Sequence, residues 1–382
     1  MLFRLYKNEI EVKRVYSVKL KKNARNIGIV SDWHWKGVPY QSRFLSKCLS
    51  GKFNVHIFAY NDIKKDEDDW GYSSLVFTKK IRPWKLLRWI KNNAIKVVFF
   101  PDRLEEERVL DLCRKNCIAT VMIINYETIK KEEFLVYRKY SKLWCPVKCT
   151  QDLLKKNGIR NSHFIRWGID NNMFSPKKAK ITFPIRYFHN AGYGGVEWRK
   201  NTLAVVDAFD MASKKNNKIR LILKTQKPIK EYPNVVQEII KKNPNIIINE
   251  KDLKMSDLIK LYRSCHISIL PSKWEGIGIP FIESLSIGLP VITVDAPPMN
   301  EWVKNGYNGC LAKVAKWERR HDKQILIKGA MVNVEELSKC ILRLSDPGLI
   351  AKLRANAIKS VRKSKKKFIK EVERFTKKLC EK

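Results

Sequence analysis

Two glutamates that frame a short glycine-rich segment are the residues of this sequence best suited to do chemistry. Glu275 begins the segment Glu275-Gly-Ile-Gly-Ile-Pro280, and Glu283 follows with seven residues between the two acids. A carboxylate among apolar neighbours, as Glu283 is between Ile282 and Leu285, needs a hydrogen-bonding partner to offset the cost of burial. A vicinal diol, such as that of a ribose, offers two hydroxyl donors to its two oxygens. The pair therefore predicts a site for a ligand rich in hydroxyl groups.

The segment between the two acids has the character of an anion site. An apolar strand precedes it, and Pro280 suits the first turn of a helix because its missing N–H has no partner there. The helix would thus begin at the glycines, with Glu283 in its first turn. We expect the amides of Gly276, Ile277, Gly278 and Ile279 to face a phosphate or a sugar.

A second glycine-rich loop carries two basic residues. It runs from Phe188 through Gly192 to Arg199, Lys200 and Asn201, between an expected strand and an expected helix. Two cations at the start of a helix oppose the helix dipole, which argues against a purely solvent-facing role. Together with the helix amides, they are predicted to neutralise a diphosphate.

Short apolar or β-branched runs alternate with helical patterns over most of the chain. Such alternation indicates doubly wound parallel α/β sheets. An aperiodic segment rich in Asn, Pro, Lys and Gly, residues 167–184, separates two such regions and indicates an interdomain linker. The strands are expected at 27–31, 54–60, 96–100, 119–124, 142–145, 162–166, 185–190, 219–224, 245–248, 266–270 and 290–294, with helices such as 84–93, 103–116, 150–157, 201–214, 235–242, 256–264 and 281–287.

The composition and charge limit the class of protein. A chain of 382 residues with 44% hydrophobic residues is expected to fold into two globular domains. Its 77 Lys and Arg against 38 Asp and Glu give a net charge of +39. Such a field attracts nucleic acid, anionic lipid headgroups or phosphorylated substrates, although a Lys-rich composition on solvated faces explains it equally well.

The cysteines and the apolar segments bear on location. The nine cysteines are an odd number, and we expect free thiols in a reducing compartment and no metal site. The first residues lack the apolar core of a secretory signal, and no stretch approaches the length of a membrane span. We expect a cytoplasmic protein, with peripheral contact to an anionic membrane left open.

The stretch from 268 to 309 resembles the signature of the retaining glycosyltransferases of family 4, which is marked by two glutamates separated by seven residues. Here these are Glu275 and Glu283. Leu270-Pro-Ser272 before the pair, and Gly288-Leu-Pro-Val-Ile292 after it, resemble the same family. The match is specific over residues 165–345 and only architectural over residues 1–164.

This resemblance implies a GT-B fold, in which two Rossmann-like domains face each other across a cleft. The N-terminal, acceptor-side domain would cover residues 1–168, with the helix 365–382 packing back on it. The nucleotide-sugar domain would cover 169–364. The donor would be a nucleotide-diphosphate sugar, with no cofactor and no metal, and the acceptor a glycan or a lipid-linked molecule.

The resemblance also implies roles for single residues. Glu275 would be catalytic and hold the sugar, Glu283 would hold the ribose, and Lys200 would bind the pyrophosphate. Tyr193 stands where the family often has arginine, so Arg199 is the alternative. The glycine-bearing loop of the first domain makes His34 and Gly37 candidates for the acceptor side. Many relatives have a histidine in a later loop of the first domain; here Asn125 or Glu127 would substitute, or the acceptor chemistry differs.

Other function classes stay open at this point. Another enzyme of the same fold, such as a sugar-nucleotide epimerase or a phosphorylase, would share the two domains. A nucleic-acid- or polyanion-binding protein on an inactive scaffold would explain the charge, but no recognisable nucleic-acid module stands out.

Overall fold

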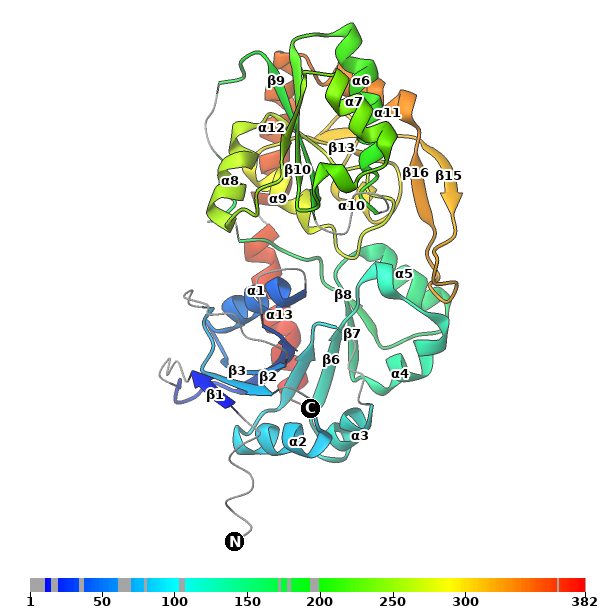
Figure 1. Ribbon diagram of the computed structural model, residues 1–382. Helices are drawn as coiled ribbons and strands as arrows, with labels where there is room; N and C mark the ends of the chain where they lie inside the picture. Colours follow the sequence, from blue (N-terminus) through cyan, green and yellow to red (C-terminus); the bar gives the residue numbers. More distant parts are fainter. Residues whose placement is uncertain are drawn as a thin grey trace. The chain divides into compact units, whose positions relative to one another are not determined.

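The computed structural model of the chain divides into two compact units (Figure 1). Unit 1 comprises Met1–Trp167 with Lys366–Lys382, and unit 2 comprises Gly168–Lys365. Each unit is built on its own sheet, in which parallel pairs predominate, with helices on its faces. The structure describes residues 11–14, 20–33, 38–60, 70–78, 81–102, 107–170, 173–176, 180–192, 199–362 and 364–381.

Unit 1 holds an eight-stranded sheet in the order β1-β4-β3-β2-β5-β6-β7-β8. Among the described strands of this sheet, only the edge strand β1 runs antiparallel to its neighbour. All four residues of β5 are buried, as expected of a parallel strand covered on both faces. The strands are β1 (Glu11–Arg14), β2 (Asn26–Asp32), β3 (Asn54–Tyr60), β4 (Ser74–Thr78), β5 (Val97–Phe100), β6 (Ala119–Ile123), β7 (Lys142–Cys145) and β8 (Ser162–Phe164).

The C-terminal helix α13 (Ser364–Cys380) packs into unit 1. Its Phe368 ring lies 5.6 Å from that of Phe44, 5.7 Å from that of Trp144 and 5.2 Å from that of Trp167, between ring centroids. This aromatic cluster joins the end of the chain to the core of its first half. The other helices of the unit are α1 (Val38–Leu49), α2 (Pro83–Asn92), α3 (Arg108–Lys115), α4 (Phe134–Lys139) and α5 (Lys148–Lys156), with the 3-10 turns η1 (Tyr126–Thr128) and η2 (Lys131–Glu133).

Unit 2 holds a six-stranded parallel sheet in the order β11-β10-β9-β12-β13-β14. A separate antiparallel hairpin, β15 with β16, follows it in the chain. The strands are β9 (Ile185–Gly192), β10 (Ile219–Thr225), β11 (Ile246–Asn249), β12 (Ile267–Ile269), β13 (Val291–Val294), β14 (Gly309–Ala312), β15 (Val314–Glu318) and β16 (Gly329–Val332).

Helices cover both faces of the unit 2 sheet. On one face lie α6 (Thr202–Lys215), α7 (Asn234–Lys242) and α11 (Val334–Arg343) (Figure 1). On the other face lie α8 (Met255–Ser264), α9 (Ile279–Ile287) and α12 (Pro347–Arg362). The short helix α10 (Met299–Trp302) contacts α9 and β13, and the 3-10 turn η4 (Ile229–Glu231) precedes α7.

The strand order places a topological switch point in unit 2 between β9 and β12. Strands β9, β10 and β11 follow one another outward in one direction, and β12, β13 and β14 in the other. In open α/β sheets, ligands bind at the carboxyl ends of the two strands that flank such a point. The chain that leaves β9 contains Arg199 and Lys200, and the chain that leaves β12 contains Glu275. The topology thus brings together residues far apart in the sequence.

Candidate nucleotide-sugar site

Glu275 lies at the centre of a charged cluster at this switch point. Lys200 Nζ forms an ion pair with its Oε1, and Arg199 Nη1 lies 2.7 Å from its Oε2. Ser272 Oγ donates a hydrogen bond of 2.7 Å to Oε1. The Lys200 side chain is only 7% exposed and that of Arg199 is 31% exposed. Lys200 is therefore a buried cation and not a solvent-facing residue at a helix start.

The two cations keep Glu275 ionised although it is buried. Burial by itself raises the pKa of a carboxyl group, because it penalises the charged form. Here the charges of Arg199 and Lys200, with the hydrogen bonds from Lys200 and Ser272, outweigh burial and lower the pKa of Glu275 to about 2. Glu275 therefore carries a full negative charge at neutral pH.

Glu283 has the opposite electrostatic setting. It is buried, and burial raises its pKa to about 7. The Tyr262 hydroxyl donates a hydrogen bond of 3.1 Å to Glu283 Oε2, and the charge of Lys200 also acts to lower the pKa, but neither outweighs burial. Glu283 therefore titrates close to neutral pH.

Helix α9 begins beside Glu275. Gly278 precedes it with φ of +87°, in the left-handed region that favours glycine. Trp302 Nε1 donates a hydrogen bond of 2.7 Å to the Ile277 carbonyl and fixes this turn. The expectation that Glu283 lies in the first turn is wrong: the helix starts at Ile279, which makes Glu283 its fifth residue.

The two loops that carry the cluster are joined through the backbone. The Lys273 amide donates to the Arg199 carbonyl over 2.7 Å, and the Asn201 side-chain amide donates to the Pro271 carbonyl over 3.2 Å. Asn201 has φ of +59°, a conformation that asparagine tolerates better than most residues. The predicted Gly192 ends β9 with φ of +64°. These constraints hold Lys200 against Glu275.

The predicted residues of unit 1 fall into two groups. Asn125 follows β6 and is buried, and its Oδ1 has no hydrogen-bond partner among the described residues. Glu127 lies two residues further, in η1. Both are at the carboxyl-end side of the sheet, where ligands of such sheets bind. His34 and Gly37 lie outside the described residues.

Four further side chains belong to the site and had no role assigned from the sequence. Ser272 and Tyr262 contact the two glutamates, and Trp302 holds the turn before α9. His189 is fully buried, between the Ile269 carbonyl at 2.7 Å and Thr202 Oγ1 at 2.9 Å. Ser272 and Tyr262 lie within residues 165–345, where the sequence resembles the family. This resemblance could have indicated that they belong to the site.

Comparisons with known structures define the fold class. The chain matches sucrose-phosphate synthase from Thermosynechococcus elongatus with a TM-score of 0.68 and 13% identity, over 93% of this chain and 99% of that chain. It matches Anabaena Alr3699/HepE, solved in complex with UDP and glucose, with a TM-score of 0.64 and 13% identity, over 93% and 98% of the two chains. The protein has the GT-B fold of two parallel-sheet α/β domains.

Comparison with known sequences adds a family match within this fold class. Residues 191–329 match the family model described as "Glycosyl transferases group 1". The chain is 26% identical over 164 residues to the capsular polysaccharide biosynthesis glycosyltransferase CapM of Staphylococcus aureus. That match covers 41% of this chain and spans 40% of the length of CapM. The region of the chain that matches this family model includes Arg199, Lys200, Glu275 and Glu283.

A membrane-spanning helix and a metal-binding cluster are both absent from the residues that the structure describes. None of the helices that the structure describes is both long and apolar enough to cross a membrane. In the same ranges, no group of three or more His, Cys, Asp or Glu side chains is arranged to hold a metal ion. Among the described residues, which include all nine cysteines, no disulfide is formed.

Proposed function

We propose that this protein is a retaining glycosyltransferase that moves a sugar from a nucleotide-diphosphate donor to a glycan, a lipid-linked molecule or another acceptor. The observation that carries the proposal is the cluster of Glu275 with Lys200 and Arg199 at the switch point of unit 2. The match of residues 191–329 to the group 1 glycosyltransferase model and the similarity to a glycosyltransferase support it. They favour neither an epimerase nor a nucleic-acid-binding scaffold.

The cluster offers a binding site for the donor diphosphate. An ammonium has three donors and a guanidinium five, so each group can contact more than one acceptor at once. In the proposal, Lys200 and Arg199 also bind the diphosphate, and the amides at the start of α9, from Gly276 to Ile279, add the positive end of the helix dipole. Stabilising the departing diphosphate in the transition state raises the rate, and here it needs no metal or cofactor.

The two glutamates would then serve two parts of the donor. Glu275 stays ionised at neutral pH, and a fixed negative charge stabilises positive character that develops at the sugar carbon. Glu283 would hold the hydroxyl groups of the ribose. Retention follows if the leaving phosphate helps to deprotonate the acceptor on the same face of the sugar. His34, Gly37, Asn125 and Glu127 would contact the acceptor.

The solved structures of this fold and the net charge bear on the donor and on the location of the protein. Relatives of this fold solved with UDP support a nucleoside diphosphate as the common part of the donor. The charge of +39 favours acceptors on anionic surfaces, and we propose a cytoplasmic enzyme with peripheral membrane contact.

A donor panel tests the proposal. Purified protein would be screened by thermal shift against the common nucleoside-diphosphate sugars, and the donor that binds would be supplied with candidate acceptors in EDTA. We expect transfer in EDTA and a product whose anomeric configuration, assigned by NMR, matches the donor. Inversion of configuration would refute the retaining mechanism, and the absence of binding by any nucleotide sugar would refute the assignment of the site.

A further inference from the structure

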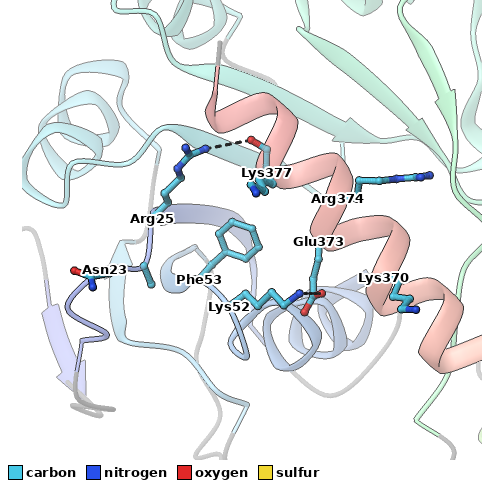
Figure 2. A pocket seen from close by; sticks show the side chains of 9 residues that line it. Asn23, Arg25, Lys52, Phe53, Lys370, Glu373, Arg374 and Lys377 are labelled. Atoms are coloured by element: carbon cyan, nitrogen blue, oxygen red, sulfur yellow. Dashed lines mark hydrogen bonds and ion pairs between the residues drawn. The ribbon is translucent and has the colours of Figure 1, made fainter.

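Unit 1 contains a basic pocket whose lining residues are far in the sequence from those of the proposed donor site. Its volume is about 390 Å³, and its lining comes from three segments: the turn before β2, the turn before β3 and helix α13 (Figure 2). Five basic side chains line it, together with a single carboxylate, Glu373. The basic residues are Arg25, Lys52, Lys370, Arg374 and Lys377.

The position of this pocket separates it from the expected acceptor site. Arg25 comes immediately before β2, and Phe53 immediately before β3, so the pocket lies at the amino ends of these strands. Substrates of doubly wound sheets bind at the opposite, carboxyl ends. The pocket is therefore at the opposite edge of the sheet from the expected acceptor site.

Internal contacts hold part of the basic lining in place. Arg25 Nη1 donates to the Lys377 carbonyl over 3.3 Å, and Lys52 Nζ lies 3.0 Å from Glu373 Oε2 (Figure 2). Across the ranges that the structure describes, Lys370 and Arg374 form no ion pair, and both are exposed. Glu381, outside the lining, lies 3.8 Å from Arg25 and 4.0 Å from Lys377. Two carboxylates thus face five cations, and the pocket keeps a net positive charge.

The walls of the pocket differ from its rim. The buried ring of Phe53 lies at the centre of the view in Figure 2, between Arg25 and Lys52, while Lys370 and Arg374 extend from α13 further from the ring. Long basic side chains commonly cover apolar surface with their stems and keep the charge in water. The pocket thus combines an apolar floor with a cationic rim, which suits an anionic group carried on an organic body.

We propose that this pocket binds a phosphate ester. A phosphate offers several terminal oxygens, so it can accept hydrogen bonds from cations that approach from different sides, and Arg and Lys both bind it. The volume lies within the range of about 300–1,000 Å³ typical of small-molecule sites. Two sources share this chemistry: the headgroup of an anionic lipid and a soluble organic phosphate.

Two triple variants of the full chain separate a built pocket from a generally basic helix. The first, Lys370→Gln with Arg374→Gln and Lys377→Gln, removes three charges from the lining. The second, Lys366→Gln with Lys367→Gln and Lys378→Gln, removes three charges from exposed positions of the same helix outside the lining. All six residues are exposed, so both variants are expected to fold, which far-ultraviolet circular dichroism would verify.

Binding is measured with two probes in 0.15 M salt. Sedimentation with phosphatidylcholine vesicles, with or without phosphatidylglycerol, tests the lipid source, and calorimetry with glycerol 3-phosphate tests the soluble one. We expect one probe or both to bind, the lining variant to lose at least tenfold in affinity, and the matched variant to lose less than threefold. Equal losses in the two variants, or no binding of either probe by the unaltered protein, would overturn the proposal.

Discussion

The loop before α9 and the body of α9 each bury one glutamate, and the two carboxyl groups have opposite electrostatic behaviour. In the loop, Glu275 is paired with Lys200 and Arg199, and its pKa falls to about 2. In the helix, Glu283 has the Tyr262 hydroxyl as its closest partner, and its pKa rises to about 7. The pairing of charges, more than the depth of burial, decides which carboxyl group is ionised.

This difference fits two different tasks. A group that stabilises developing positive charge must be ionised before the reaction, which Glu275 achieves with its two cations. A group that holds hydroxyls need not be ionised before its ligand binds. The diol itself supplies the hydrogen-bond donors that the buried carboxylate lacks. In our proposal, donor binding therefore favours the ionised form of Glu283.

The largest expected effect comes from breaking the ion pairs of the loop. Glu275→Gln leaves the buried Lys200 ammonium without its negative partner, and removing one partner of a buried pair typically costs about 3–5 kcal/mol of unfolding free energy. Urea denaturation at pH 7 measures this loss. Glu335→Gln, at an exposed glutamate of α11, is the matched control and should stay within about 0.5 kcal/mol of the unaltered protein. A loss below 1 kcal/mol in Glu275→Gln would show that the pairing is weak.

Removing the charge of Glu283, the glutamate within α9, should stabilise the folded protein above neutral pH, whereas the same change at Glu275 destabilises it. The folded-state pKa of Glu283, about 7, lies above the ordinary value of 4.5, so between these two pH values the folded protein keeps a proton that the unfolded chain has lost. The resulting stability is fully present below pH 4.5 and is lost as the pH rises through 7. Glu283→Gln carries no charge, so it should be more stable than the unaltered protein by roughly 3 kcal/mol at pH 8.5 and equally stable at pH 4.5.

Urea denaturation at the two pH values tests this difference in stability. Binding of a donor nucleotide provides a second test of the role of Glu283. The same Glu283→Gln variant should show weaker binding of a nucleoside diphosphate, since an amide accepts fewer hydrogen bonds than a carboxylate. A stability difference that does not change between pH 4.5 and pH 8.5 would contradict the assigned pKa.

A smaller effect is expected at the turn between the two glutamates. Gly278→Ala places a side chain at φ of +87°, and its Cβ would lie 3.0 Å from Trp302 Nε1. The left-handed conformation alone costs roughly 1–2 kcal/mol for a residue other than glycine. Gly51→Ala is the control, because its Cβ would meet nothing within 4 Å. If thermal denaturation shows equal stability for the two variants, the turn does not constrain the start of α9.

The strands of both sheets were largely predictable from the sequence because each is a short apolar or β-branched run. The expected strand at 54–60 coincides with β3, and that at 142–145 with β7. The strands β1, β4, β14, β15 and β16 were not predicted: β15 consists mostly of exposed residues, and β14 and β16 are only four residues long and begin with glycine. Local composition indicates a strand most clearly where it supplies a continuous apolar or alternating run.

The local parts of the candidate site were predictable in the same way, and the long-range parts were not. The spacing of Glu275 and Glu283 and the glycines between them are visible in one stretch of sequence. The bonds from Lys200 and Arg199 to Glu275 join positions 75 and 76 residues apart, so they depend on the sheet order. The pKa values of the glutamates follow from these contacts and were equally out of reach.

The most direct test of the central claim is calorimetric titration of Lys200→Ala with a nucleoside diphosphate and with its monophosphate. Losing one charge-assisted contact costs about 1.5–3 kcal/mol, which corresponds to roughly 10- to 150-fold in affinity for the diphosphate. Lys214→Ala, at an exposed lysine of α6, is the control and should bind both nucleotides like the unaltered protein. We predict that Lys200→Ala no longer favours the diphosphate over the monophosphate. Unchanged diphosphate affinity in Lys200→Ala would contradict the account.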